Sequence, residues 1–405
     1  MSAPVVTDAA LRERAAAALP NGMYGHMKTT ALGEPYPQFI AHADGCRLTD
    51  ADGRAYVDLM CAYGPMLLGY GHPGVRAAAR AQEERGDCVT GAAPVLVELA
   101  ELLVDTIAHA DWAMYAKNGT DATTTCVTIA RAATGKRKVL AARGSYHGAA
   151  PWCSQRGDGV TPEDQAHLVF YDYNDLASVR EAVAEAGDDL AAVLVTPFRH
   201  DLKRDQELAS PEFARGLREI CDRTGAVLVL DDVRCGFRLD LAGSWEPLGV
   251  RPDLSAWSKA IANGYALAAV TGTDALREAV SRVYVTGSFW YSAVSMAAAK
   301  ATLTELRETD ALARIERAGT RLRNGLAAQA DAHGFTINQT GPVQMPLLTF
   351  AGDADFTTGL RWAREAVRRG VYLHPWHNWF LSAAHTDADI DEALSRTNEA
   401  FAALR

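Results

Sequence analysis

The sequence predicts an α/β fold, in which a large domain built on a mainly parallel sheet is joined by a smaller α+β domain. Between about residues 75 and 275, short apolar runs alternate with helical stretches. This order is typical of a parallel sheet covered by helices on both faces. From about residue 290 onward, helical patterns dominate. A chain of 405 residues is also too long for one small core and fits a large domain with a smaller one.

The N-terminal part predicts a helix, an irregular stretch and a hairpin. Residues 8–19 have a short helical pattern that ends at a Pro-Asn-Gly turn. Residues 23–36 are rich in Gly, Thr and Pro and show no clear period. Residues 39–59 alternate apolar and polar side chains about Asp52-Gly53, which is a strong hairpin signal. The glycine-studded loop that follows, residues 61–73, would let backbone approach a ligand closely.

The central and C-terminal elements follow from the apolar runs and the helical periods. The strands predicted for the large sheet are 112–116, 138–142, 190–195, 226–230, 254–257 and 267–271. The helices predicted for the C-terminal part are 294–307, 311–333, 356–370 and 387–404, with strand-like pieces at 346–350, 371–374 and 380–383.

Composition excludes several classes of protein. The formal net charge of -10 disfavours nucleic acid or an anionic membrane surface as the main partner. The seven cysteines are scattered and include no C-x-x-C pair, so we predict no disulfide framework, no thiolate metal site and a reducing, cytoplasmic location. The N-terminus lacks the pattern of a signal peptide, and no apolar run is long enough to span a bilayer.

A candidate anion site follows the strand at 112–116. Asn118, Gly119, Thr120 and Asp121 lie where this strand would lead into a helix. The glycine permits a tight turn, and the hydroxyl and the first helix amides would then point at one spot. Asn, Thr and Asp are also ordinary helix caps, so the same residues fit a capped loop without a ligand.

An aromatic residue lies between two glycines after the strand at 138–142. The segment Gly144-Ser145-Tyr146-His147-Gly148 would hold the Tyr146 ring where backbone crowding is low, and the ring would be able to stack on a planar cofactor. A half-buried surface tyrosine explains the same pattern.

An acid and a lysine complete the set. Asp231 and Asp232 end an apolar strand, and because neighbouring strand residues face opposite sides, only one of them can face the ligand crevice. Lys259 lies among apolar residues at another strand end, where desolvation would lower its pKa and make it a nucleophile. A salt-bridged acid pair and a lysine with an exposed head are the alternatives.

The four features match the parts of a pyridoxal 5′-phosphate (PLP) site. The phosphate needs amides and hydroxyls, the ring needs stacking, the protonated pyridine nitrogen needs a carboxylate, and the aldehyde needs a lysine. A nicotinamide enzyme fits less well, because no G-x-G-x-x-G follows a predicted strand.

With these motifs, the chain resembles the class III aminotransferases of PLP fold type I, most closely the branch of glutamate-1-semialdehyde aminomutase. The segments that carry the resemblance begin with GCRLTDADGRAYVDLMCAYGPMLLGYGHP and continue with NGTDATTTCVTIARAATGKRKVL, GSYHG, VLVLDDVRCGFR, PDLSAWSKAIANGY, GSFWYSAVSMAAAKATL and LSAAHTDADID. The resemblance implies PLP as cofactor, a seven-stranded sheet, and three parts: an N-terminal segment 1–60 that joins the small domain, a large PLP-binding domain 61–285 and a C-terminal small domain 286–405.

The resemblance also implies roles for individual residues. Lys259 would form the Schiff base and move the proton, Asp231 would pair with the pyridine nitrogen, and Tyr146 would stack on the ring. The other cofactor-binding positions that it implies are Asn118, Gly119, Thr120, His147, Asp201 and Val233, together with Ser288. Ser288 stands where the family has Thr and would reach the phosphate of the neighbouring subunit, which implies a homodimer with shared active sites.

The departures from the family pattern concern the substrate. Thr196 replaces a glutamate that pairs with a substrate-binding arginine in many relatives. Asp201 aligns with the asparagine that usually touches the cofactor's phenolic oxygen, so His200 is an alternative for that contact. We expect substrate contacts from Tyr63, Arg199, Trp290, Tyr291, Trp376 and Trp379. Some of these aromatic residues would equally fit the core or a dimer interface.

These expectations favour an aminotransferase that moves an amino group between an amine or amino acid and a carbonyl acceptor. The aromatic side chains suggest a cyclic, aromatic or sugar-like substrate. An aminomutase and an amino acid racemase or epimerase use the same PLP-handling residues and stay open as alternatives.

Overall fold

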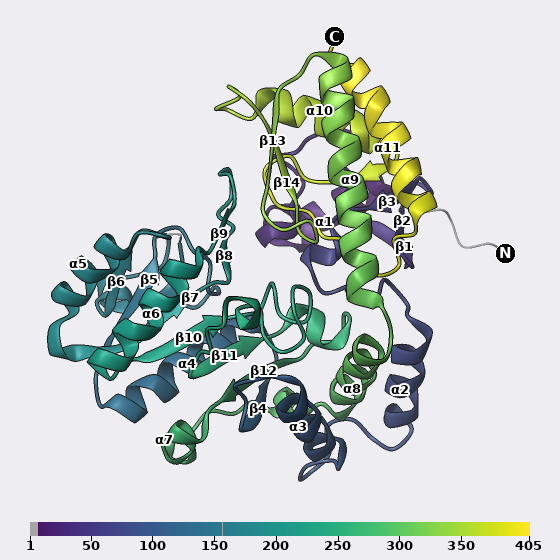
Figure 1. The fold of residues 1–405 in the computed structure, drawn as a ribbon. Helices are drawn as coiled ribbons and strands as arrows, with labels where there is room; N and C mark the ends of the chain where they lie inside the picture. The colour runs from purple at the N-terminus through teal and green to yellow at the C-terminus, as the bar shows by residue number, and fades with distance from the viewer. Residues whose placement is uncertain (1–6, 156) are drawn as a thin grey trace.

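The computed structural model describes residues 7–155 and 157–405, so the first six residues of the predicted N-terminal segment lie outside the described part. Two bodies are visible (Figure 1), one around a large sheet and one around the longest helix. The large sheet has seven strands in the order β4-β12-β11-β10-β7-β5-β6. The β12 strand is antiparallel to both of its neighbours, and the other pairs are parallel. The mainly parallel α/β sheet that the sequence predicts is therefore confirmed.

The elements have the following bounds. The strands of the large sheet are β4 (Trp112–Ala116), β5 (Lys138–Ala142), β6 (Leu168–Tyr171), β7 (Leu190–Val195), β10 (Val227–Asp231), β11 (Leu254–Trp257) and β12 (Ala268–Gly272). The remaining strands are β1 (Ile40–Asp44), β2 (Arg47–Asp50), β3 (Ala55–Asp58), β8 (Phe198–Arg199), β9 (Glu207–Leu208), β13 (Ile337–Thr340), β14 (Leu347–Phe350) and β15 (Val371–Tyr372). The α-helices are α1 (Asp8–Ala18), α2 (Pro73–Glu83), α3 (Val95–Thr106), α4 (Gly119–Thr134), α5 (Leu176–Ala186), α6 (Pro211–Thr224), α7 (Arg277–Arg282), α8 (Ala293–Glu308), α9 (Ala311–His333), α10 (Thr357–Arg368) and α11 (Asp387–Ala402).

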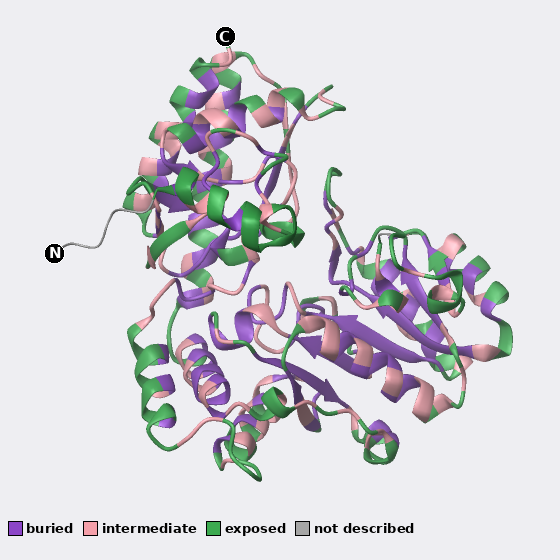
Figure 2. Ribbon diagram, turned by 180° about the vertical axis from the view of Figure 1, so that it is seen from behind, coloured by how far each residue is buried: buried purple, intermediate pink, exposed green. Residues whose placement is uncertain are grey.

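Alternate residues of the central strands pack against different helices. In β10, Leu228 and Leu230 belong to the cluster that α5 and α6 cover, whereas Val227 and Val229 pack with α4. The strands of this sheet are mostly buried (Figure 2). Because helices cover both faces of the sheet, its strands are apolar on both sides and do not alternate between apolar and polar residues.

The second body joins the two ends of the chain. Its sheet has the order β1-β2-β3-β15, and β15 pairs in parallel with β3. The Tyr36 hydroxyl donates to the Leu373 carbonyl, 337 residues further along the chain. Arg47 of β2 forms ion pairs of 2.6 Å with Asp389 and Glu392 of α11. Residues of the predicted N-terminal segment thus lie against the C-terminal helices.

The helix α8 lies with the first body. It packs against α2 and α3 beside the large sheet (Figure 1), and the chain crosses to the second body after it. The predicted boundary at residue 286 would place α8 in the C-terminal domain, so this boundary stays a prediction.

Some predicted elements differ from the structure. The strand β6 was not predicted, although its four residues, LVFY, are apolar or aromatic; it lies at the edge of the sheet. The strand expected at 380–383 is a buried stretch without ladder pairing. The predicted hairpin is present, with Asp52 and Gly53 in the turn between β2 and β3.

The cysteines are free throughout the described residues, and only Cys88 among them is exposed. Within the described part, no helix combines the length and the apolar character needed to cross a membrane.

Candidate active site

A cavity of about 500 Å³ opens at the carboxyl ends of β4, β10 and β11. This is the edge of a parallel sheet at which α/β proteins bind ligands. Its lining includes most of the cofactor-binding residues expected from the sequence: Asn118, Gly119, Thr120, Tyr146, His147, Asp231, Val233 and Lys259. The structure therefore brings together residues from four separate segments of the chain.

The N-terminus of α4 forms one end of the cavity. Asn118 caps the helix: its side chain accepts from the Asp121 amide at 3.1 Å, and the Asp121 carboxylate accepts from the Asn118 amide at 3.2 Å. The first amides of a helix have no partner within the helix, so those of Gly119 and Thr120 are available to an anion. This end fits a phosphate group.

Two glycines keep this end open. A Cβ atom on Gly119 would lie 2.7 Å from Cγ1 of Val233. A Cβ atom on Gly148, whose φ is +132°, would lie 2.7 Å from Oγ1 of Thr120. Both contacts are too close for carbon to occupy without movement, so the backbone forms a cradle that a larger side chain would fill.

Asp231 carries the carboxylate that faces the cavity. Its Oδ2 lies 2.7 Å from Nδ1 of His147, and both side chains are buried. Nε2 of His147 is a buried polar atom for which the described residues provide no hydrogen-bond partner. Asp232 points elsewhere, where it accepts from the Ser244 hydroxyl at 2.5 Å and the Ser244 amide at 3.0 Å. Burial raises the pKa of Asp232 to about 7.

Lys259 follows β11 and enters the cavity from a strained backbone. Its φ is +37°, a region that side chains with a Cβ rarely adopt. Its Nζ atom donates to the Tyr63 carbonyl at 3.1 Å. Burial lowers the pKa of Lys259 to about 7, and the nearby charge of Arg234 lowers it further in the same direction. About half of the amine is therefore neutral, and nucleophilic, at pH 7.

The carbonyl that contacts Lys259 belongs to a left-handed turn. Cys61, Ala62, Tyr63 and Gly64 have φ values of 45°, 54°, 64° and 115°. Each non-glycine residue in this region costs about 1–2 kcal/mol. Asp58 holds the start of the turn, because its carboxylate accepts from the Met60 amide at 2.8 Å and the Cys61 amide at 3.0 Å. The turn aims the Tyr63 carbonyl at the lysine.

The stretch at 196–201 places the histidine, and not the aspartate, in the cavity. His200 is part of the lining, and burial followed by the charge of Arg234 lowers its pKa well below the usual value. Asp201 lies behind Gly144, where its Oδ2 would be 2.8 Å from an added Cβ. Arg199 forms an ion pair of 2.7 Å with Glu207, so the charge of this predicted substrate contact is already neutralised.

The aromatic residues expected to contact the substrate are dispersed and do not line the cavity of the single chain. Trp379 is 1% exposed, stacks on Trp362 at 6.0 Å and donates to the His374 carbonyl, so the expectation that it touches substrate conflicts with its burial in the core. Trp376 packs at 6.3 Å from Phe356. The ring of Tyr63 lies edge-on to His26 and His377. Trp290 packs beside the α4 cluster, and Tyr291 is exposed.

Ser288 lies on the surface, outside the cavity of its own chain. It begins a short helical turn, Ser288–Tyr291. Beside it, the Phe289 ring lies 4.9 Å below Nζ of Lys117, and Lys117 lines the mouth of the cavity. The segment therefore adjoins the site without closing it.

Sequence reasoning missed part of the lining. Pro65, Ser258 and the segment from Gly264 to Leu267 also face the cavity. The Asn263-Gly264 dipeptide was the available signal, since Asn-Gly marks a turn. Asn263 has a φ of +45°, and its side chain bonds the Leu68 amide and the Gly69 carbonyl. This turn fixes the loop after Lys259 to the loop between β3 and α2.

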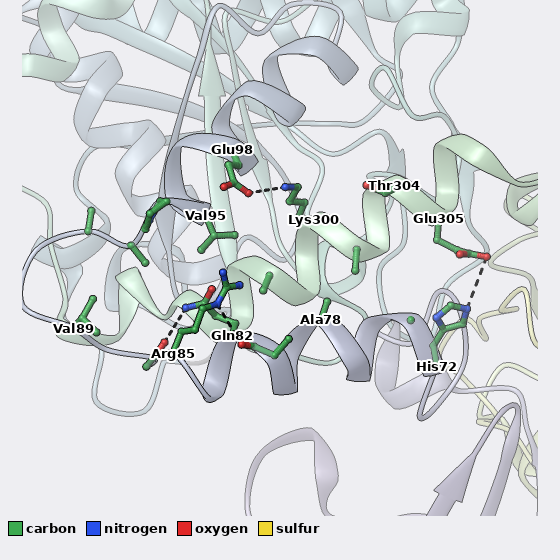
Figure 3. Close-up of a pocket in the computed structure, with 18 residues that line it drawn as sticks. His72, Ala78, Gln82, Arg85, Val89, Val95, Glu98, Lys300, Thr304 and Glu305 are labelled. Atoms are coloured by element: carbon green, nitrogen blue, oxygen red, sulfur yellow. Dashed lines mark hydrogen bonds and ion pairs between the residues drawn. The ribbon is translucent and has the colours of Figure 1, made fainter.

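A larger groove, of about 680 Å³, lies between α2, α3 and α8 (Figure 3). Its polar groups are largely paired: Lys300 with Glu98 at 2.6 Å, and His72 with Glu305 at 3.9 Å. Unlike the smaller cavity, it has neither a buried lysine nor a buried carboxylate: the side chains of Lys300 and Glu98 are 45% and 48% exposed. The smaller cavity is therefore the candidate active site.

The residues of the smaller cavity fit PLP. The amides of α4 and the glycine cradle suit a phosphate, Asp231 suits a protonated pyridine nitrogen, and the desolvated Lys259 suits an aldehyde. Tyr146, half exposed, and Val233 provide two surfaces for a planar ring.

Comparison with known proteins agrees with this chemistry. The family model "Aminotransferase class-III" matches residues 30–401. The aminopentol aminotransferase of Sphingopyxis macrogoltabida is 50% identical over 394 residues, which are 97% of this chain and 93% of that protein. A glutamate-1-semialdehyde 2,1-aminomutase from Desulfitobacterium hafniense is 31% identical over 418 residues, covering 96% of this chain and 97% of that protein.

Solved structures match as well. The PLP internal aldimine form of the FumI protein of Sphingopyxis sp. MTA144 has a TM-score of 0.97 and 50% identity, and the match covers 98% of this chain and 96% of that chain. An omega-transaminase from Sphaerobacter thermophilus has a TM-score of 0.90 and 25% identity, covering 99% of this chain and 98% of that chain. The aminomutase branch expected from the sequence is thus the more distant relation. The cofactor of this chain is PLP, its reaction is amino transfer, and the chain belongs to the class III aminotransferases.

Proposed function

We propose that this aminotransferase takes its amino group from a polyhydroxylated amine, of the aminopentol kind named for its relative, and passes it to a carbonyl acceptor. The observation that carries the proposal is the 50% identity with the aminopentol aminotransferase over 97% of this chain. The site is compatible with a donor that lacks a carboxylate, since Arg199 is already paired with Glu207. Hydroxyl and imidazole groups on Tyr146, His200 and Tyr265 line the cavity and suit a hydroxylated chain.

The cofactor contacts are part of this proposal. The amides of Gly119 and Thr120 hold the phosphate, Tyr146 and Val233 cover the two faces of the ring, and Asp231 pairs with the pyridine nitrogen. Support comes from the shared cavity and from the cradle at Gly119 and Gly148. Bound PLP supplies an electron sink that makes the proton next to the amine acidic.

Lys259 holds the cofactor aldehyde and moves the proton. Its pKa of about 7 keeps a neutral amine available as a base near physiological pH. When Nζ is not engaged with the cofactor, the Tyr63 carbonyl accepts a hydrogen bond from it at 3.1 Å and holds it at the edge of the cavity. His147 orients the Asp231 carboxylate through the contact at 2.7 Å.

The working form that we propose is a cytoplasmic homodimer with shared active sites. Exposed aromatic side chains cluster in one segment, with Tyr284 91% exposed, Phe289 61% and Tyr291 43%. Exposed aromatic clusters of this kind mark association surfaces. Ser288 lies among them and would reach a partner's phosphate. Sedimentation of Tyr284→Asp tests the interface: a monomer supports it, and an unchanged dimer contradicts it.

The donor proposal is tested in a single half-reaction. PLP-loaded enzyme is mixed with an aminopentol, with the matching polyol that lacks the amine, or with common amino acids. Loss of the visible absorbance of the lysine-bound cofactor is then followed. Rapid loss with the aminopentol alone supports the proposal. Equal rates with an α-amino acid overturn it. Intramolecular movement of the amine without an acceptor would favour the aminomutase, and inversion at the amine-bearing carbon would favour the racemase.

A further inference from the structure

Asp58, the last residue of β3, is a buried carboxylate held by neutral groups alone. Its Oδ1 accepts from the Met60 amide at 2.8 Å, and its Oδ2 accepts from the Cys61 amide at 3.0 Å and from the Tyr70 hydroxyl at 2.8 Å. Among the described residues no cation forms an ion pair with it, and burial raises its pKa to about 6. A buried carboxylate of this kind depends on its hydrogen bonds to offset the loss of water.

The same set of hydrogen bonds is found at Asp50, in β2. There Oδ1 accepts from the amides of Asp52 and Arg54, both at 2.9 Å, and Oδ2 accepts from the Tyr56 hydroxyl at 2.7 Å. The turn that Asp50 holds connects β2 to β3, is largely exposed and lies outside the lining of the cavity. Two buried carboxylates therefore hold two turns in the same way, and Asp50 provides an internal reference for Asp58.

The turn held by Asp58 contacts Lys259 at two places. The Tyr63 carbonyl accepts from Nζ of Lys259 at 3.1 Å, and among the described residues no other group accepts a hydrogen bond from this amine. A Cβ atom on Gly64 would lie 3.2 Å from Cδ of Lys259, so the backbone also packs against the lysine stem. Buried Arg238 holds the far end of the turn, because it donates to the Gly64 carbonyl at 2.6 Å. The turn is thus fixed at both ends and touches both the head and the stem of the lysine.

We propose that Asp58, together with Tyr70, is a positioning residue for proton transfer: it holds the turn so that the Tyr63 carbonyl keeps Nζ of Lys259 in place. This inference rests on the proposed role of Lys259 as the base. A neutral amine has two N–H bonds and one lone pair, so an N–H donated to a fixed carbonyl restricts where the lone pair points. The proton passes from the amine-bearing carbon of the donor to Nζ, and the electron pair of the broken C–H bond is taken up by the bound cofactor.

The first experiment measures the placement of the amine without any substrate. Apoenzyme is mixed with PLP, and three quantities are recorded: the rate at which the visible band of the lysine-bound cofactor appears, its final intensity, and the melting temperature of the apoenzyme. The variants are Asp58→Asn and Tyr70→Phe. Their matched controls are Asp50→Asn and Tyr56→Phe, which remove the same groups from the hairpin turn.

Asp58→Asn is expected to take up PLP roughly tenfold to 100-fold more slowly, since displacement of a reacting group by about 1 Å has effects of this size. Tyr70→Phe should be slower roughly twofold to tenfold, because it removes one hydrogen bond while both amides still hold the turn. Both controls should keep the wild-type rate. A purely structural role would lower the melting temperature and the final intensity in the variants and controls alike, and would leave the rate of the folded fraction unchanged.

The second experiment follows proton removal itself. PLP-loaded enzyme is mixed with an aminopentol that carries hydrogen or deuterium on its amine-bearing carbon. In Asp58→Asn the rate at saturation should fall, while the donor concentration that gives half of this rate changes little. The deuterium isotope effect should be at least as large as in the wild type, because proton removal is the step that slows.

Uptake rates in Asp58→Asn and Tyr70→Phe equal to those of their controls would overturn the proposal. So would a slower half-reaction with a smaller isotope effect, which places the loss in a different step. If Asp58→Asn does not fold, Tyr70→Phe decides the result. The uptake experiment uses no donor, so failure of the aminopentol would refute the proposed function and leave the uptake result standing.

Discussion

Adding one methyl group at Gly119 should weaken PLP binding without unfolding the protein. The added Cβ would lie 2.7 Å from Cγ1 and 3.2 Å from Cγ2 of Val233, whereas ordinary contacts begin at 3.4 Å. Val233 must then move by roughly 0.7 Å, and overpacking of this kind costs about 1–3 kcal/mol. Without the cofactor, Val233 is able to move into the cavity. With the PLP ring in place Val233 cannot move there, so the cost appears as weaker PLP binding.

A cost of about 1–3 kcal/mol corresponds to a dissociation constant for PLP raised about fivefold to 150-fold. The measurement is a titration of the apoenzyme with PLP, followed by visible absorbance, alongside thermal unfolding of the apoenzyme. Gly74→Ala is the matched control, since a Cβ there would meet only His72, at an ordinary 3.6 Å.

The second variant tests the cause. Val233→Ala removes both γ-methyl groups, and of the Val233 atoms near the added Cβ only its own Cβ, at 3.5 Å, remains. The double variant should therefore bind PLP more tightly than Gly119→Ala alone. Wild-type affinity in Gly119→Ala, or a double variant no better than the single one, would refute the reasoning.

Three further predictions concern the reactive groups. Lys259→Ala should lose the visible band of the lysine-bound cofactor and at least about 10²–10⁴-fold in transamination rate; a variant that keeps both would exclude Lys259 as the attachment site. Asp231→Asn should slow transamination roughly tenfold to 150-fold, because it removes a charged hydrogen bond worth about 1.5–3 kcal/mol, and steady-state kinetics with apoenzyme stability as control will measure it. Because the pKa of Lys259 is lowered to about 7, the amine is protonated below that pH, so the rate at which apoenzyme takes up PLP should fall about tenfold per pH unit below pH 7. A midpoint above pH 9 would contradict this, and Arg234→Gln should move the midpoint upward, since it removes a nearby positive charge.

That the residues proposed to bind the cofactor share one cavity was largely predictable, and the reason is local. Gly119, Tyr146, Asp231 and Lys259 lie at the ends of strands with strong apolar runs, and a parallel sheet gathers such ends at one edge. Their order along the chain was therefore enough to bring them together.

The substrate half depends on contacts that no local pattern encodes. Arg199 is paired because Glu207 lies opposite it in a short hairpin. Which of His200 and Asp201 faces the cavity depends on how the irregular stretch around them turns. Trp379 looked like a pocket residue, yet its indole completes the packing against Trp362.

The pairing of β15 with β3 has a consequence for how the enzyme is made. The left-handed turn that meets Lys259 begins only three residues after β3 ends, and β3 completes its ladder with Val371 and Tyr372. During synthesis the large sheet is able to form while the C-terminal segment is still inside the ribosome, but the strand that supports the turn must wait for it. We therefore expect a nascent chain cut short before residue 371 to fold its sheet and still fail to retain PLP. Cofactor capture would then be one of the last events in the maturation of this protein.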